Sequence, residues 1–162
     1  MYIKLIQPLM HMRPMDTHIK NRMSPPLGLY TIANMFRDEH EVVIENENIQ
    51  KLDLTDHPDI VGISVNVDSL PRALEIASEY KLKGVPVVLG GILPTMAPEM
   101  IPDGCVDVIC IGAAEGTWRD IVKDVQSRSL KKVYRCSHQL SGKDIISPAY
   151  DIFLPNTVAK II

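Results

Sequence analysis

The chain has 162 residues, of which 46% are hydrophobic and 23% charged, and its formal net charge is −3. This balance is typical of one globular domain with a sizeable core, and the absence of a basic segment argues against nucleic acid as a partner. No apolar stretch approaches the roughly 18 residues of a membrane span, and the N-terminus lacks a signal-peptide pattern. We therefore expect a cytoplasmic protein without a membrane partner.

Five short apolar runs predict β-strands, and the last three are continuous in Val, Ile and Leu rather than alternating with polar residues. Continuous runs indicate burial on both faces, as in a parallel sheet covered by helices. The predicted strands are residues 2–6, 41–45, 60–65, 85–89 and 106–111.

Three intervening segments, 24–40, 68–84 and 115–126, have the apolar spacing of helices. In the first, Ser24 is the expected N-cap, followed by Pro25 in the first turn. In the third, Thr117 and Asp120 have the spacing of a capping box. Between the second and third strands, residues 46–59 predict a loop with a turn of helix around 51–54.

Alternation of strands and helices predicts a doubly wound α/β fold with a five-stranded parallel sheet. Such sheets bind ligands at the carboxyl ends of their strands, so the function is expected there. The segments after the last three strands, "SVNVDS", "GGILPT" and "GAAEGT", are rich in glycine and in small or hydroxyl side chains. Because such segments expose backbone, they favour a large, flat or long ligand that is not chiefly a phosphate.

The common small ligands of this fold lack their motifs. A dinucleotide-binding fold requires a glycine-rich turn after the first strand, where this chain has Gln7, Pro8 and Leu9. A Gly-Lys-Ser/Thr phosphate loop is absent from the sequence as well. The paired acids and the lysine of a phosphoacceptor receiver domain are also missing from the corresponding strand ends.

The segments "SPPLGLYTIANMF", "DIVGISV", "GVPVVLGGILPT" and "DVICIGAAEGTW" occur in this order between residues 3 and 125. This pattern resembles the N-terminal cobalamin (vitamin B12)-binding domain of cobalamin-dependent radical S-adenosylmethionine (SAM) enzymes. The resemblance implies a flavodoxin-like sheet, with the corrin ring at the strand ends and the dimethylbenzimidazole tail beside the fourth and fifth strands. Gly90 and Gly91 would then leave room for the tail.

The resemblance, together with the strand ends, assigns the cofactor contacts. The expected cobalamin-binding residues are Leu9, Pro26, Leu27, Gly28, Ser64, Val65, Asn66, Gly90, Gly91, Ile92, Thr95, Gly112, Ala113, Ala114, Glu115 and Gly116. For several of these the sequence leaves a purely structural role open. Ser64 and Asn66 could instead satisfy backbone groups, Thr95 could cap a helix, and Glu115 could favour the N-terminus of the helix that follows.

The chain departs from the family pattern at two points. Residues 112–116 read Gly-Ala-Ala-Glu-Gly, where members usually carry a Gly-Glu-Gly-Glu-Gly-like run. A C-x-x-x-C-x-x-C motif is absent, so no [4Fe-4S] cluster is expected on this chain. Residues 131–162 resemble the linker that leads into a radical SAM domain. We expect a cobalamin-binding domain at 1–130 and a linker at 131–162, without catalysis by this chain alone. The chain would be either an excised N-terminal domain or a natural stand-alone relative. In the first case, SAM and the cluster would belong to a missing C-terminal domain, and the full enzyme would use cobalamin for methyl transfer or other radical chemistry.

Asp16 and His18 are spaced as in the Asp-x-His-x-x-Gly motif of other cobalamin modules, in which the histidine binds cobalt from below. Asn21 stands where the motif has glycine, and the motif lies too far from the first strand. His18 as a cobalt ligand is therefore one hypothesis, and a solvated loop is the other.

Two other functions remain as alternatives. A flavodoxin-like regulatory or docking module could keep this fold without binding cobalamin. An enzyme acting on a small substrate at the strand ends ranks last, because the sequence shows no evident nucleophile–base pair.

Overall fold

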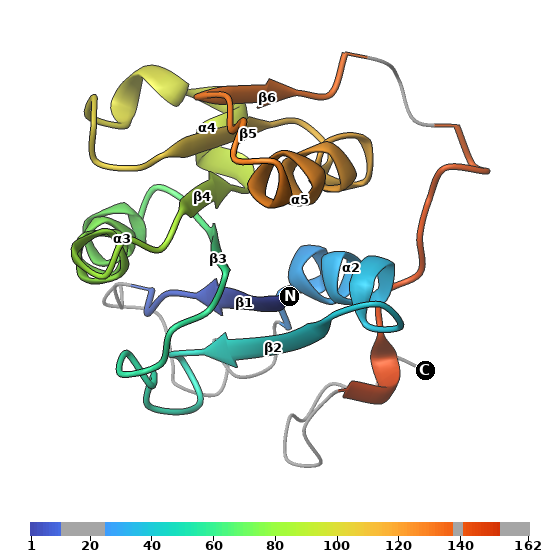
Figure 1. The fold of residues 1–162 in the computed structure, drawn as a ribbon, viewed down its shortest axis with the longest axis horizontal. Helices are drawn as coiled ribbons and strands as arrows, with labels where there is room; N and C mark the ends of the chain where they lie inside the picture. The colour runs from blue at the N-terminus through green and yellow to red at the C-terminus, as the bar shows by residue number, and fades with distance from the viewer. Residues whose placement is uncertain (11–24, 138–140, 153–162) are drawn as a thin grey trace.

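A computed structural model gives the fold and describes residues 1–10, 25–137 and 141–152. All strand pairs are parallel, and the sheet has the order β2-β1-β3-β4-β5-β6 (Figure 1). The strands are β1 (Tyr2–Gln7), β2 (Glu41–Asn46), β3 (Ile60–Ser64), β4 (Val87–Gly90), β5 (Val108–Ile111) and β6 (Val133–Arg135). The predicted doubly wound parallel sheet is confirmed.

The predicted count of five strands is wrong, because β6 adds a sixth. It pairs with β5 in the register Cys110 to Tyr134, and Tyr134 is buried in the core. The sequence conceals this strand because it has only three residues, and the outer two are exposed. Since β6 lies within the segment 131–162, the sheet extends beyond residue 130.

Helices cover both faces of the sheet, as predicted. The helices are α2 (Leu27–Phe36), α3 (Leu70–Leu82), α4 (Ile92–Met96) and α5 (Trp118–Gln126), with three-residue 3₁₀ turns η1 (Pro98–Met100), η2 (Ala114–Gly116) and η3 (Tyr150–Ile152). Figure 1 shows α2 and α5 on one side of the sheet and α3 and α4 on the other. Two separate hydrophobic clusters result, one under each pair of helices.

The predicted helix ends need correction. The N-cap of α2 is Pro26, so Pro25 lies before the helix, and Ser24 falls outside the described residues. Thr117 occupies the N-cap position of α5 but its side chain forms no cap hydrogen bond, so the predicted capping box is wrong. Residues 51–54 form no turn of helix; the backbone turn of this loop lies at residues 47–50.

The loop at residues 46–59 takes the place of a helix between β2 and β3, and a buried lysine lies beneath it. Lys4 of β1 is fully buried, with Nζ 2.8 Å from Asp56 Oδ2 and 3.1 Å from Glu45 Oε2. The hydroxyls of Tyr2 and Tyr80 donate to the Asp56 carboxylate at 2.6 and 2.7 Å. This polar network attaches the loop to the sheet and satisfies groups that burial would otherwise penalise.

Within the described residues, every helix is too short or too polar to cross a lipid bilayer.

Candidate ligand pocket at the strand ends

The sheet face beneath α2 and α5 changes from bulky to small side chains toward the carboxyl ends of the central strands. Side chains on one face recur at every second residue of a strand. Near the amino ends this face carries Ile60, Val88 and Val108, which belong to the core. Two residues further along the strands it carries Gly62, Gly90 and Cys110. The helices therefore pack closely over one half of the face and leave space over the other.

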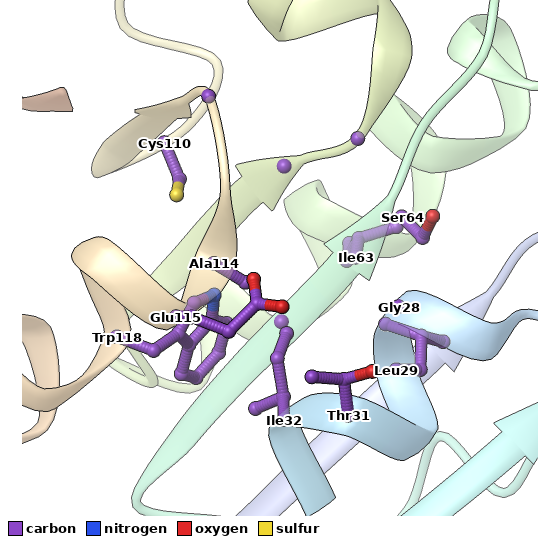
Figure 2. Close-up of a pocket in the computed structure, with 14 residues that line it drawn as sticks. Gly28, Leu29, Thr31, Ile32, Ile63, Ser64, Cys110, Ala114, Glu115 and Trp118 are labelled. Carbon is purple, nitrogen blue, oxygen red and sulfur yellow. The ribbon is translucent and has the colours of Figure 1, made fainter. Parts of the chain in front are cut away.

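That space is a cavity of about 200 Å³ between α2, α5, η2 and the sheet. In Figure 2, Ile32 and Thr31 of α2 face Trp118 and Glu115 across it. The lining residues are Gly28, Leu29, Thr31, Ile32, Gly62, Ile63, Ser64, Gly90, Gly91, Cys110, Gly112, Ala114, Glu115 and Trp118. The cavity lies near the point where the strand order reverses, which is where open α/β sheets bind ligands.

Gly90 leaves part of the cavity open without being required by the packing of the protein. A Cβ atom built at this position would meet only the Cβ of Cys110, at 3.8 Å, which is an ordinary contact. A larger side chain would extend into the cavity, because Gly90 lines it. Glycine here therefore keeps this part of the cavity open.

The neighbouring Gly91 has a different role. Its φ angle is +106°, and a Cβ atom would lie 2.8 Å from both the backbone nitrogen and the oxygen of Val65. The backbone after β3 approaches closely here: Val65 N donates to Gly90 O at 2.8 Å, and Leu93 N donates to Val65 O at 3.1 Å. Gly91 is thus needed for the fold, whatever the cavity binds.

Several polar groups around the cavity are already paired within the protein. Thr31 Oγ1 donates to Leu27 O at 3.1 Å, and Cys110 Sγ lies 3.0 Å from Thr117 Oγ1. Burial raises the pKa of the Cys110 thiol, and the hydrogen bond with Thr117 opposes this only in part. A raised pKa is the opposite of what an activated cysteine nucleophile needs, so Cys110 serves as a small wall residue.

Glu115 is the charged side chain of the lining. A carboxylate accepts hydrogen bonds and repels anions, so it suits a ligand group that is neutral or carries hydroxyls. The remaining lining is mainly aliphatic, aromatic or glycine, which suits a flat apolar group.

The structure brings part of the expected contact set together. Of these residues, Gly28, Ser64, Gly90, Gly91, Gly112, Ala114 and Glu115 line the cavity. The others lie outside its lining: Leu9, Pro26, Leu27, Val65, Asn66, Ile92, Thr95, Ala113 and Gly116. Two of these use their side chains in hydrogen bonds within the protein. Asn66 Oδ1 accepts from Ser69 N, and Thr95 Oγ1 donates to Gly91 O and accepts from Gly112 N.

Some of the outer residues form an apolar edge at the carboxyl ends of the strands. Leu9 after β1, Val67 after β3, and Ile92 and Met96 of α4 are 49%, 61%, 66% and 76% exposed. Leu9 is held in place because its N–H donates to Glu47, which in turn pairs with Arg72. Exposed apolar side chains thus follow the ends of β1, β3 and β4.

Sequence reasoning missed half of the lining: Leu29, Thr31, Ile32, Gly62, Ile63, Cys110 and Trp118. Strand alternation could have identified Gly62 and Cys110, because both fall on the same face as Gly90. The aliphatic and aromatic members have the pattern of ordinary core residues, and no sequence signal distinguishes them.

His18 and Asp16 lie outside the described residues, so the cobalt-ligand hypothesis stays a prediction. Within the residues that the structure describes, no group of three or more His, Cys, Asp or Glu side chains is arranged to hold a metal ion.

Comparison with known proteins identifies the family to which this domain is similar. The model of the B12 binding domain matches residues 18–122, which is more than half of the chain. An uncharacterized methyltransferase of Pyrococcus horikoshii is 31% identical over 87% of this chain and 34% of its own length. Bacteriochlorophyllide d C-8(2)-methyltransferase of Chlorobaculum tepidum is 29% identical over 67% of this chain and 24% of its own length.

The C-12(1)-methyltransferase of the same organism is 26% identical over 85% of this chain and 30% of its own length. The chain thus spans about a third or less of these relatives. The family match includes the three strands that line the cavity, β3, β4 and β5, together with α2, η2 and the start of α5. With a cavity at the strand ends and a family model covering most of the fold, the chain belongs to the B12-binding domain family.

Proposed function

We propose that this domain holds cobalamin with the nucleotide tail in the cavity and the corrin ring over the carboxyl ends of the strands. The observation that carries the proposal is the space over Gly90 and Cys110 at the carboxyl ends of β4 and β5, which α2 and α5 leave open and which Trp118 borders. A cavity of about 200 Å³ has room for a bicyclic aromatic base, since an apolar cavity of ~150 Å³ binds benzene.

The exposed apolar edge supports the placement of the corrin. Leu9, Val67, Ile92 and Met96 would lie against the ring, which is too large for the cavity. The other expected contacts outside the cavity, such as Leu27 and Asn66, would lie at the same edge.

We further propose that the domain works within a longer protein, where a radical SAM domain would carry SAM and a [4Fe-4S] cluster. Relatives named as methyltransferases, of which this chain spans about a third, support methyl transfer as the reaction. Bound cobalamin would supply the methyl-carrying chemistry, and the residues of this chain would position it and shield its tail from water. Residues 131–162 would include the connection between the two domains.

Retention of cobalamin on a desalting column tests the binding proposal. The wild-type chain, mixed with hydroxocobalamin, is expected to elute with the corrin absorption. Gly90→Leu is expected to lose most of this colour while remaining folded, because its Cβ has room but the rest of the side chain fills the cavity. Circular dichroism confirms the fold of each variant.

Gly142→Leu is the matched control. Gly142 is exposed, and a Cβ built there meets no atom within 4 Å, so the same substitution adds leucine away from the cavity. This variant is expected to retain cobalamin as the wild type does. A colourless wild-type fraction would contradict the proposed function. Full retention of cobalamin by Gly90→Leu would show that the tail does not occupy the cavity.

A further inference from the structure

The polar groups available in the cavity are few, and this limits which tail base it can accept. Among the described residues, the lining side chains with a hydrogen-bonding group left unpaired are Ser64, Glu115 and Trp118. Trp118 is 3% exposed, and Figure 2 shows its indole nitrogen on the same side of the cavity as Glu115. The hydroxyls of Thr31 and Thr117 are already used within the protein.

The α2 wall opposite Trp118 and Glu115 offers no free side-chain donor, because the Thr31 hydroxyl already donates to Leu27 O. Ile32 of α2 faces the indole across the cavity, and Cys110 with the bare backbone of Gly62 and Gly90 forms the sheet side. Ile32 is 5% exposed and Cys110 2% exposed, so water has little access to a group placed against them. A polar edge of a ligand turned toward this wall would lose its hydrogen bonds to water without replacement.

We infer that this cavity selects cobamides by their tail base, accepting an apolar benzimidazole and disfavouring a purine. The inference rests on the proposed function. A benzimidazole joined to its ribose keeps a single ring nitrogen that needs a donor, which the indole N–H of Trp118 or the hydroxyl of Ser64 can supply. Its remaining edge is hydrocarbon and suits Ile32, Cys110 and the glycines.

An adenine base places several ring nitrogens and an amino group around its edge. Glu115 can accept from the amino group, but the ring nitrogens that face the aliphatic wall find no donor there. Unpaired polar groups placed against an apolar wall lower affinity, and a mainly apolar pocket discriminates against an added polar group by about 10- to 100-fold. This is the ratio expected between the two cobamides.

Titration of the wild-type chain with three ligands tests the inference: cobalamin, a cobamide whose base is adenine, and cobinamide, which lacks the base. Binding is measured by the change in the corrin spectrum and by equilibrium dialysis. Cobalamin is expected to bind about 10- to 100-fold more tightly than the adenine form. If the two cobamides bind with equal affinity and cobinamide binds much more weakly, selection by the base is contradicted. The placement of the tail in the cavity would still be supported.

Two further results would overturn the inference together with part or all of the proposed function. If cobinamide binds as tightly as cobalamin, the tail does not enter the cavity at all. If none of the three ligands binds, the proposed function fails together with the inference.

A pair of variants tests the wall directly. Ile32→Asn adds an amide that can pair with a purine edge, so it should reduce the ratio of the two affinities several-fold. Ile32→Val keeps the wall apolar and should leave the ratio near the wild-type value. An unchanged ratio in Ile32→Asn, with the fold intact by circular dichroism, would show that wall polarity does not set the preference.

Discussion

Trp118 lies directly over Gly62, and this contact links the stability of the fold to the position of the cavity wall. A Cβ atom at Gly62 would come within 2.5 and 2.7 Å of two indole carbons and within 2.9 Å of Leu5 Cδ2. Trp118 and Leu5 are both buried, so neither can move aside without disturbing the core. The glycine in β3 is therefore a packing requirement, in contrast to Gly90 in the adjacent strand.

Gly62→Ala is accordingly expected to destabilise the protein by about 1–3 kcal/mol, the usual cost of overpacking a core. The single tryptophan of the chain is Trp118, so its fluorescence during urea unfolding measures the effect. Gly90→Ala is the control, because its Cβ would make only an ordinary contact and should leave the midpoint nearly unchanged. Equal midpoints for the two variants would contradict this account.

These residues also show how far the sequence specifies the site. Gly90 and Gly91 were predicted as contacts because glycines at the end of an apolar run interrupt the strand pattern. Ile32 and Trp118 could not be predicted, because an apolar side chain that borders a cavity has the same spacing as one that fills a core. Whether such a side chain borders a cavity or fills a core depends on the size of residues on another element, here Gly62 and Gly90.

At the scale of elements, the strands and major helices were predictable. The buried polar network beneath the loop at residues 46–59 was not. Lys4 lies within an apolar run, and nothing in the sequence indicates that its ammonium group is buried. The partners of that group, Asp56 and Glu45, come from the loop and from β2. Such a network depends on long-range pairing of strands, which local periodicity does not contain.

The Asp56 carboxylate gives this loop an acid-dependent contribution to stability. Burial acts to raise the pKa of Asp56, but hydrogen bonds from Lys4, Tyr2 and Tyr80 outweigh it and lower the pKa. A pKa below the unfolded value of about 3.9 means that the contribution is complete above that pH. It is lost as the pH falls through the lower folded-state value.

Asp56→Asn should therefore lower the free energy of unfolding near neutral pH, by about 1.5–3 kcal/mol for hydrogen bonds to a charged group. It should also flatten the decline in stability of the wild type between about pH 5 and the acid range. Urea unfolding across this pH range measures both effects. Asp103→Asn, at an exposed position, is the control. A variant curve that stays parallel to the wild type through the acid range would contradict the role of Asp56.

At the scale of the whole molecule, the chain after α5 returns to the domain twice. β6 closes the edge of the sheet, with Ile109 N donating to Lys132 O at 2.8 Å and Cys136 N donating to Ile111 O at 2.9 Å. Residues 147–151 then lie along α2, where Asn34 Nδ2 donates to Ser147 O and Ala149 N donates to Tyr30 O. Figure 1 shows this segment beside α2.

β6 should contribute more to the stability of the domain than residues 147–151. β6 buries a core side chain, whereas residues 147–151 form mostly exposed contacts. Tyr134 of β6 is 6% exposed, and its hydroxyl donates to Asp124 at 2.6 Å. Arg37 and Asp151, which join η3 to α2, are 37% and 68% exposed, and exposed ion pairs contribute little. A chain shortened to residues 1–130 lacks Tyr134, so it should be less stable by ~2 kcal/mol or more than one ending at 137, which is the usual contribution of a large buried side chain. Unfolding midpoints in urea for 1–130, 1–137 and the full chain test this order. A 1–130 chain as stable as 1–137 would show that β6 is dispensable to the sheet, and would favour treating everything after residue 130 as linker.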